Sequence, residues 1–212
     1  MGAVCMQNSF DQKAKTWDQP FRIARAQAVA NAIREVIPKN HAFRALEYGC
    51  GTGLVSFFLR DMFSSITLVD SSEGMLEVVR EKIAYEGAIN MKAMHTDALD
   101  MQIKNGMTFD VIFNLLVLHH IPDTRQVLSD WHKYLIKGGY LFVVDLDPEN
   151  GLFHKDDFEG HNGFDRNVLR KVATEAGFKN ISFATAHRMC ELGRDGCEHV
   201  FTLFLMVARK NS

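Results

Sequence analysis

A glycine-rich turn that begins with an acidic residue is the segment whose residue types and spacing point most directly to chemistry. Residues 47–53 read Glu-Tyr-Gly-Cys-Gly-Thr-Gly, after a largely apolar run at 42–46 and before an amphipathic stretch at 54–62. Glycines at alternate positions let the backbone turn sharply and approach a ligand more closely than a Cβ would permit. This order of strand, turn and helix predicts that the segment holds a nucleotide-like ligand.

The spacing of the glycines separates this turn from the dinucleotide-binding fingerprint. That fingerprint is G-x-G-x-x-G, whereas this chain has G-x-G-x-G followed by Leu54. Glu47 places a carboxylate at the end of the strand, where it suits a cationic ligand better than a pyrophosphate. A nicotinamide-dependent oxidoreductase is therefore an alternative that both Leu54 and Glu47 oppose.

A second set of residues, near the C-terminus, could in principle bind zinc. It consists of His187, Cys190, Cys197 and His199. Their spacing fits no standard structural zinc site, and residues 191–196 between them are typical of a hairpin loop. We therefore expect that the chain holds no metal.

Alternating strands and helices must position the glycine turn. The hydrophobic pattern predicts strands at 43–48, 65–69, 91–95, 109–116 and 140–145, and helices at 21–37, 54–62, 72–85 and 123–135. Gly138 and Gly139 are expected to end the last of these helices. Because strands alternate with helices, the sheet should be largely parallel and covered on both faces.

The C-terminal part departs from this alternation. A loop at 146–163 and a helix at 165–176 precede two predicted strands, 181–187 and 199–208, with no convincing helix between them. Two strands joined in this way predict an antiparallel hairpin at the end of the sheet.

Composition limits the classes of protein to consider. The chain has 212 residues, 47% of them hydrophobic, which suits one domain with a sizeable core. A formal net charge of -2 argues against a nucleic-acid partner. Four cysteines without a CxxC pair favour a reducing, cytoplasmic location, and residues 1–8 lack the pattern of a signal peptide. No apolar run approaches the roughly 20 residues that span a bilayer.

Four motifs together resemble the class I S-adenosylmethionine-dependent methyltransferases, especially the small-molecule enzymes of the ubiquinone and menaquinone biosynthesis group. The motifs are the glycine turn at 47–53 and the segments 68–76, 96–98 and 109–121. The resemblance extends over about residues 10–208. It implies an α/β fold, a Rossmann-like three-layer sandwich whose seven-stranded, mostly parallel sheet has an antiparallel last strand.

The resemblance also implies a single methyltransferase domain over residues 1–212. Its parts are an N-terminal helical lid at 1–38, a cofactor-binding core at 42–145 and a substrate-side loop, helix and hairpin at 146–212. Phe10 and Trp17 resemble the aromatic start of the lid, although a staple that packs an N-terminal helix is an equal alternative.

S-adenosyl-L-methionine is the cofactor that the resemblance implies. Gly49, Gly51 and Gly53 would line it, Glu47 would hold the methionine ammonium, and Asn114 would meet the methionine part at the end of the fourth strand. The alternative for Glu47 is a structural carboxylate bonded to backbone amides, and both roles are compatible.

The nucleoside part of the cofactor would meet two acidic segments. Asp70, with Ser71 beside it, is the candidate for the ribose hydroxyls, and Asp97 with Ala98 is the candidate for the adenine. The alternatives are that Asp70 is a helix N-terminal acid favoured by the dipole and that Asp97 caps a loop.

The acceptor side is less determined by the sequence. Transfer from a sulfonium is an in-line displacement, which needs alignment of the reacting groups, and a general base only when the acceptor is protonated. His119 and His120 follow the fourth strand, where the family borders the transferred methyl, and are the catalytic candidates. Further candidates for bases or acceptor contacts are Asp145, Asp147, His154, His161 and Asn162.

These features predict a cytoplasmic enzyme that transfers a methyl group to a small-molecule acceptor. We expect no nucleic acid, no membrane span, and a monomer or homodimer. A protein methyltransferase and a non-catalytic S-adenosylmethionine-binding module remain alternatives.

Overall fold

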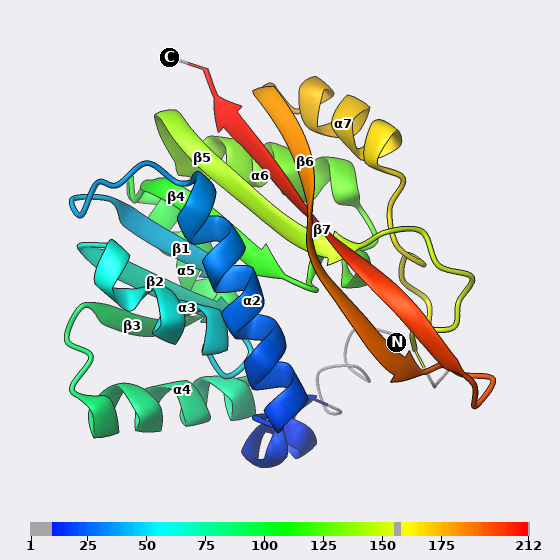
Figure 1. The fold of residues 1–212 in the computed structure, drawn as a ribbon. Coiled ribbons are helices and arrows are strands. Elements are labelled where there is room, and N and C mark those ends of the chain that lie inside the picture. Colours follow the sequence, from blue (N-terminus) through cyan, green and yellow to red (C-terminus); the bar gives the residue numbers. More distant parts are fainter. Residues whose placement is uncertain (1–9, 155–157, 212) are drawn as a thin grey trace. The chain divides into compact units, whose positions relative to one another are not determined.

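The protein is described by a computed structural model for residues 10–154 and 158–211 (Figure 1). Its seven strands form one sheet in the order β3-β2-β1-β4-β5-β7-β6. The predicted fold class, a mostly parallel sheet flanked by helices with the last strand reversed, is confirmed. Residues 1–9, and with them the start of the predicted lid and the segment compared with a signal peptide, lie outside the described residues.

The chain comprises two compact units, Met1–Phe113 and Asn114–Ser212, and each is described by itself. The strands that lie in unit 1, or begin there, are β1 (Arg44–Tyr48), β2 (Ser65–Asp70), β3 (Met91–His95) and β4 (Phe109–Leu115). β1 pairs in parallel with β2 and β4, and β2 pairs in parallel with β3. The carboxyl ends of β1, β2 and β3 therefore share one edge, which is where ligands bind in open α/β sheets.

The helices of unit 1 are the short η1 (Ala14–Thr16), α2 (Pro20–Val36), α3 (Leu54–Leu59) with its extension η2 (Arg60–Met62), α4 (Glu73–Glu86) and α5 (Thr96–Lys104). α2 packs against α3, whereas α4 and α5 pack against β2 and β3 (Figure 1). Helix α5 was not predicted from the sequence. The segment 96–98, expected as an acidic turn, is its first turn, and Leu99 is the helix's one buried residue among those described. One buried position leaves little of the periodicity that predicts a helix.

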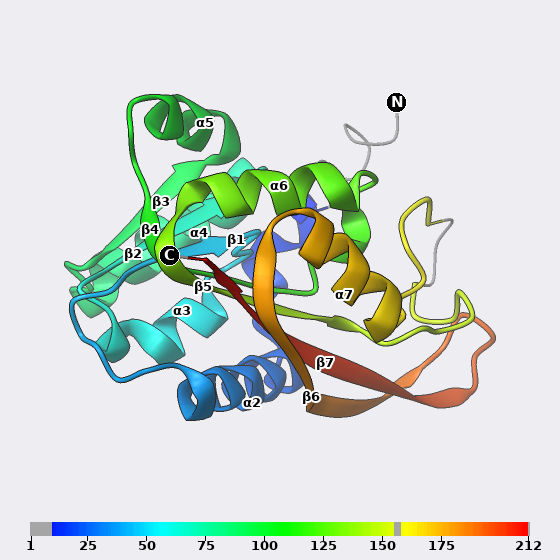
Figure 2. The same cartoon turned by 90° about the horizontal axis from the view of Figure 1, so that it is seen from above.

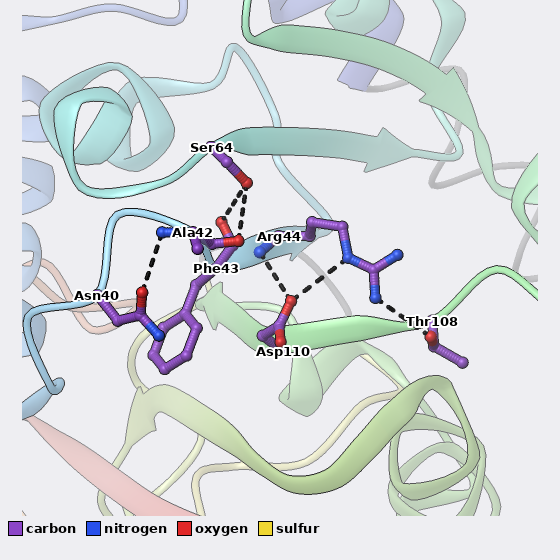
Figure 3. A network of polar contacts seen from close by, with 7 residues as sticks. All are labelled: Asn40, Ala42, Phe43, Arg44, Ser64, Thr108 and Asp110. Atoms are coloured by element: carbon purple, nitrogen blue, oxygen red, sulfur yellow. Dashed lines mark hydrogen bonds and ion pairs between the residues drawn. The ribbon is translucent and has the colours of Figure 1, made fainter.

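A polar network at the amino ends of β1 and β4 holds these strands in register (Figure 3). The Asp110 carboxylate accepts hydrogen bonds from the Arg44 backbone N–H at 2.9 Å and from its Nε at 3.4 Å. The Ser64 hydroxyl donates to the carbonyl oxygens of Ala42 and Phe43. This network lies at the sheet edge opposite to the glycine turn, so its role is structural.

Unit 2 contains η3 (Leu118–His120), α6 (Thr124–Tyr134), β5 (Leu135–Leu146), α7 (Arg166–Glu175), β6 (Phe178–Leu192) and β7 (Glu198–Lys210). β7 runs antiparallel to both β5 and β6, which confirms the predicted hairpin, although its strands are longer than expected. α6 and α7 lie side by side (Figure 2). Among the described residues, no helix combines the length and the apolar character needed to cross a membrane.

The predicted end of helix α6, at residue 135, differs from the observed end by one residue, but the expectation that Gly138 and Gly139 end the helix is wrong. The helix ends at Tyr134, and Gly138 and Gly139 lie inside β5, which begins at Leu135. Gly138 has a φ of 77°, and its carbonyl oxygen accepts a hydrogen bond from Arg209 at 3.0 Å. The glycines therefore accommodate an irregular start of a strand that pairs with β7, a contact that the local sequence does not reveal.

Candidate functional site

Glu47, near the end of β1, is a buried carboxyl group, with only 2% of the residue exposed. One of its oxygens, Oε2, accepts hydrogen bonds from the hydroxyl of Ser56 and, at 3.2 Å, from the Ser56 backbone N–H. Burial raises the pKa of Glu47 to about 8, against the lowering effect of the Ser56 bonds. A cation arriving beside Glu47 would reverse this shift, because it favours the charged carboxylate.

The glycine turn after β1 is fastened to the end of β2. Gly49, Gly51 and Gly53 all have positive φ angles, and a Cβ on Gly53 would lie 2.8 Å from the Leu68 side chain. The Asp70 carboxylate accepts from the backbone N–H of Gly51 at 2.8 Å. Asp70 thus holds the backbone of the glycine turn through Gly51 and also lies next to the turn, at the end of β2.

Asp70 retains capacity for a ligand. Its second oxygen accepts from the Ser72 backbone N–H at 2.9 Å, and the Ser71 backbone N–H is a third donor to the carboxylate. An ionised carboxylate can accept about four hydrogen bonds. Burial raises its pKa although these backbone bonds lower it. The half-buried Asp70 therefore keeps part of its acceptor capacity, which suits a ribose hydroxyl.

His95, which the sequence analysis did not identify, connects the two acidic segments. Its Nε2 lies 3.1 Å from the carbonyl oxygen of Ser71, and its Nδ1 accepts from the backbone N–H of Asp97 at 3.3 Å. The Asp97 side chain is 91% exposed, in the first turn of α5, and Ala98 is half-buried beside it. Asp97 and Ala98 therefore lie beside the end of β3, where we expect the adenine to bind. Asp97 does not cap a loop, as the alternative had it, but lies at the N-terminus of helix α5.

The N-terminal segment is tied to the start of α4. The Asp11 carboxylate accepts from the hydroxyl of Ser72 at 2.5 Å and from the backbone N–H of Gly74 at 3.0 Å. Ser72 also caps α4 by accepting from Met75. Asp11 thus joins Ser72 in capping the N-terminus of α4, the helix that follows Asp70.

The N-terminal segment also forms hydrogen bonds with the glycine turn itself. Asp18 accepts from the hydroxyl of Thr52 and, at 2.9 Å, from Nζ of Lys82, which also donates to the Thr52 carbonyl. A Cβ on Gly51 would lie 3.7 Å from Nε1 of Trp17. The segment predicted as a lid therefore lies against the turn, and Trp17 packs edge-on against Phe10 at a centroid distance of 5.7 Å. Sequence spacing does not reveal these ties because their partners are far apart in the chain.

In unit 2, His119 and Asp145 form a buried pair, with 1% and 0% of the residues exposed. Nδ1 of His119 lies 2.7 Å from Oδ1 of Asp145, and the His119 backbone N–H donates to Oδ2 at 3.2 Å. The carboxylate therefore holds the proton on Nδ1, which leaves a lone pair on Nε2. Asp145, expected as a substrate contact, is engaged in positioning His119.

His120 and His154 complete a cluster of three histidines. The ring centroid of His119 lies 4.1 Å from that of His120 and 5.2 Å from that of His154. Burial lowers the pKa of His120 to about 3, and the neighbouring His119 and His154 add to this effect. His120 is therefore uncharged at neutral pH.

The loop expected to contact the acceptor packs onto this cluster. The His161 backbone N–H donates to the His119 carbonyl at 2.8 Å, while its Nε2 lies 3.1 Å from the Ile121 carbonyl oxygen. A Cβ on Gly160 would collide with the ring of Phe158 and with the His119 carbonyl. His161 thus holds the loop in place, whereas Asn162, the third substrate-binding candidate, is exposed.

Asn114 and Leu116 mark the end of β4 within unit 2. Asn114 is 1% exposed, and neither its amide nitrogen nor its amide oxygen has a hydrogen-bond partner among the described residues. Leu116 has a φ of 56°, an uncommon conformation for a branched side chain. A strained turn beside an unsatisfied buried amide is typical of a functional site.

Other candidates have structural partners. Asp147 is held by Arg166 through two hydrogen bonds of 2.7 Å, so it is not poised as a base. Within the described part of the chain, the zinc candidates near the C-terminus do not gather as a ligand group, and His199 pairs with Asp195 at 3.0 Å.

The chain is similar in sequence to known methyltransferases. A family model described as a methyltransferase domain matches residues 46–143. An uncharacterized methyltransferase of Schizosaccharomyces pombe is 29% identical over 163 residues, which cover 70% of this chain and 56% of that protein. A ubiquinone biosynthesis O-methyltransferase of Nitrosococcus oceani is 31% identical over 152 residues, which cover 68% and 63%. The chain spans about half the length of the curated relatives it matches.

The fold is shared with phosphoethanolamine N-methyltransferase 2 of Haemonchus contortus, whose structure was solved in complex with S-adenosyl-L-methionine. The TM-score is 0.64 at 16% identity, over 88% of this chain and 52% of that chain, and it shows the fold alone. The family model and the sequence relatives are methyltransferases, and the acidic strand ends and the glycine turn of this fold are features expected of such a protein. A methyltransferase domain therefore occupies residues 46–143, and its similarities support a class I S-adenosylmethionine-dependent methyltransferase.

Proposed function

We propose that this protein transfers a methyl group from S-adenosyl-L-methionine to a small-molecule acceptor. The observation that carries the proposal is the pair of acidic strand ends beside the glycine turn, Glu47 and Asp70. A buried carboxyl with a raised pKa suits a cationic amino acid group, and a half-buried carboxylate with remaining acceptor capacity suits a ribose hydroxyl. The residues of unit 1 therefore fit this cofactor.

The roles of the donor-side residues follow from their contacts. Glu47 would accept the methionine ammonium, while Gly49, Gly51 and Gly53 would let the backbone lie close to the cofactor. Asn114, with its buried and unsatisfied amide, is proposed to bind the methionine part. Asp97 and Ala98 are proposed to meet the adenine, and Ser71 the ribose side of the same edge.

The chain's task in the reaction is alignment. S-adenosylmethionine supplies both the methyl group and its activation, so the protein binds and orients the donor and excludes water. The hydrogen bonds of Asp11 to Ser72 and of Asp18 to Lys82, all within unit 1, support an N-terminal segment that shields the donor.

A hydroxyl-bearing small molecule is the acceptor class to test first. The relative from Nitrosococcus oceani is named an O-methyltransferase, which supports an oxygen acceptor. An acceptor hydroxyl needs a base, and Nε2 of His119, whose ring is fixed by Asp145, is a candidate. His120 is the second proposed catalytic residue, and His161 and Asn162 are proposed to border the acceptor.

Binding of the donor product tests the first half of the proposal. We expect calorimetric titration to show saturable binding of S-adenosylhomocysteine and none of NAD. Glu47→Gln should weaken this binding, whereas Glu81→Gln, the same substitution at an exposed position of α4, should not. Binding of NAD alone would reject the proposal in favour of an oxidoreductase.

Turnover tests the second half. Radiolabelled S-adenosylmethionine would be incubated with a panel of phenols, catechols and hydroquinones, and with protein fractions. We expect the label in a small molecule. Label in protein would favour the protein methyltransferase alternative, and donor binding without any transfer would favour a non-catalytic module.

A further inference from the structure

Three histidines of unit 2 bring ring nitrogens together at one place. His119 and His120 belong to η3, and His154 follows β5. Each offers one ring nitrogen, and these atoms all lie within 4.8 Å of one another. The ring centroids of His120 and His154 are 5.3 Å apart. This is the one gathering of three potential metal ligands among the described residues.

His119 is prepared to act as a ligand through Nε2. Its Nδ1 is engaged with Asp145 at 2.7 Å, and its Nε2 has no hydrogen-bond partner among the described residues. The ring is 1% exposed, so water does not readily replace the missing partner. Histidines that bind metals usually donate their other ring N–H to a carboxylate, which fixes the tautomer and raises the basicity of the ligand.

The walls of the cluster are apolar. The ring of Phe158 stacks on His154 at a centroid distance of 3.6 Å, and Phe153 lies edge-on to His119 at 6.3 Å. An aromatic packing role alone would leave the buried Nε2 of His119 unsatisfied, at a cost of about 1–3 kcal/mol. A bound cation would satisfy this atom, and the apolar surroundings would limit its exposure to water.

We propose that His119, His120 and His154 form a binding site for a divalent metal ion of the zinc class, with Asp145 as a positioning residue. Imidazole nitrogens suit zinc, copper, nickel and iron. With zinc–nitrogen bonds of about 2.0–2.1 Å, tetrahedral geometry separates the nitrogens by about 3.3 Å. Modest closure of the three rings would therefore complete the site.

Three protein ligands leave one coordination position open. Such a set is typical of catalytic zinc sites, whereas structural sites use four protein ligands. The open position would take a water molecule or an oxygen of a small molecule. The proposal goes beyond methyl transfer and departs from the expectation, drawn from the sequence, that the chain holds no metal.

A metal and a proton compete for the same atom of His119. A nitrogen that donates its lone pair to a cation cannot also accept a proton from an acceptor. The metal-loaded protein would therefore not use His119 as a general base.

Cobalt and zinc titrations test the site directly. The full chain would be stripped with a chelator and titrated with Co²⁺, with visible d–d absorption as the readout, followed by displacement with Zn²⁺. We expect about one equivalent of tight binding per chain. His120→Gln and His154→Gln should each weaken Zn²⁺ binding, and Asp145→Asn should weaken it about 10–100-fold.

The matched control is His132→Gln in α6 of the same unit, whose ring packs against Phe178 outside the cluster. It should bind Zn²⁺ like the parent. Absence of saturable binding, or parental binding by His154→Gln, would overturn the proposal. Thermal unfolding and binding of S-adenosylhomocysteine by each variant report whether it is folded. Because the second measurement concerns unit 1, a failed metal site and a failed donor site are distinguishable.

Discussion

The two units each contain a buried carboxyl group that ends a strand or lies near its end, but the two groups differ in their partners. Glu47 of β1 receives its hydrogen bonds from Ser56, and its pKa is raised to about 8 by burial. Asp145 of β5 is engaged by the ring and the backbone of His119. The first carboxyl is the proposed partner of the cationic group of the donor, whereas the second already accepts hydrogen bonds from His119 of its own unit.

This difference separates binding from positioning. A carboxyl that is costly to ionise in the free protein releases its proton when a cationic ligand stabilises the charged form, so its ionisation is coupled to binding. A carboxylate with local partners contributes to stability and to the orientation of its histidine. Burial alone does not distinguish the two roles, because both groups are almost completely buried.

The largest expected effect is on the stability of unit 2. Asp145→Ala should lower the free energy of unfolding by about 3–5 kcal/mol, because it leaves buried polar groups of His119 without a partner. Urea unfolding followed by circular dichroism measures this change. Asp195→Ala, which removes the exposed partner of His199, should have little effect. Equal losses in both variants would contradict a special role for Asp145.

The next effect is on donor binding by unit 1. Asp70→Ala should weaken binding of S-adenosylhomocysteine by about 100-fold, since hydrogen bonds to a charged group contribute about 1.5–3 kcal/mol each. It also releases the N–H of Gly51. Calorimetry measures the affinity, and Asp61→Ala, at a side chain that is 95% exposed, is the control. Parental affinity in Asp70→Ala would remove the ribose role from this residue.

Glu47→Gln should stabilise the free protein while it weakens donor binding. The pKa of Glu47 is about 8 in the folded state, whereas an ordinary glutamate, as in the unfolded state, has a pKa of 4.5. At a pH between these two values, the folded state keeps the proton that the unfolded state releases. Between these values, rising pH lowers the stability of the parent but not of the variant. The gain should be about 3 kcal/mol at pH 7 and should vanish near pH 4.

Thermal unfolding of parent and variant from pH 4 to pH 9 measures this window. The amide oxygen of glutamine can still accept from Ser56, so the substitution preserves the local bond. A gain that is independent of pH would show that the ionisation of Glu47 is not its cause.

The smallest expected effect concerns the tie between the N-terminal segment and the glycine turn. Asp18→Asn should weaken donor binding by at most about fivefold, because the partly exposed pair with Lys82 contributes less than about 1 kcal/mol. Calorimetry with S-adenosylhomocysteine measures it. Glu73→Gln, which removes an exposed ion pair with Arg80, should leave the affinity unchanged. A loss near 100-fold in Asp18→Asn would make the tie a direct part of the binding site.

The sequence predicted the parallel strands well, because each is a short apolar run between turn residues. The predicted strand 91–95 coincides with β3, and the predicted strand 43–48 differs from β1 by one residue. The helix that sequence reasoning missed, α5, buries only Leu99 among its described residues. Gly138 was wrongly expected to end helix α6, because glycine both ends helices and permits irregular strands.

The candidate site was predicted only in part. Glu47, Asp70 and the glycines stand in one local motif, so their types and spacing identify them. Asp11, Asp18 and His95 were not identified, because each meets partners that are distant in sequence. A sequence pattern read over a window of ten residues cannot reveal such a contact.

By itself, the sequence determined the alternation of strands and helices, the reversed hairpin and the acid-flanked glycine turn. These features depend on interactions between near neighbours and on which positions must be buried. The tertiary structure alone decided that Asp145 serves His119 and that His154 joins His119 and His120. Residues 119 and 145 come together only when the chain packs, and the chemistry of a histidine depends on which of its nitrogens that packing leaves available.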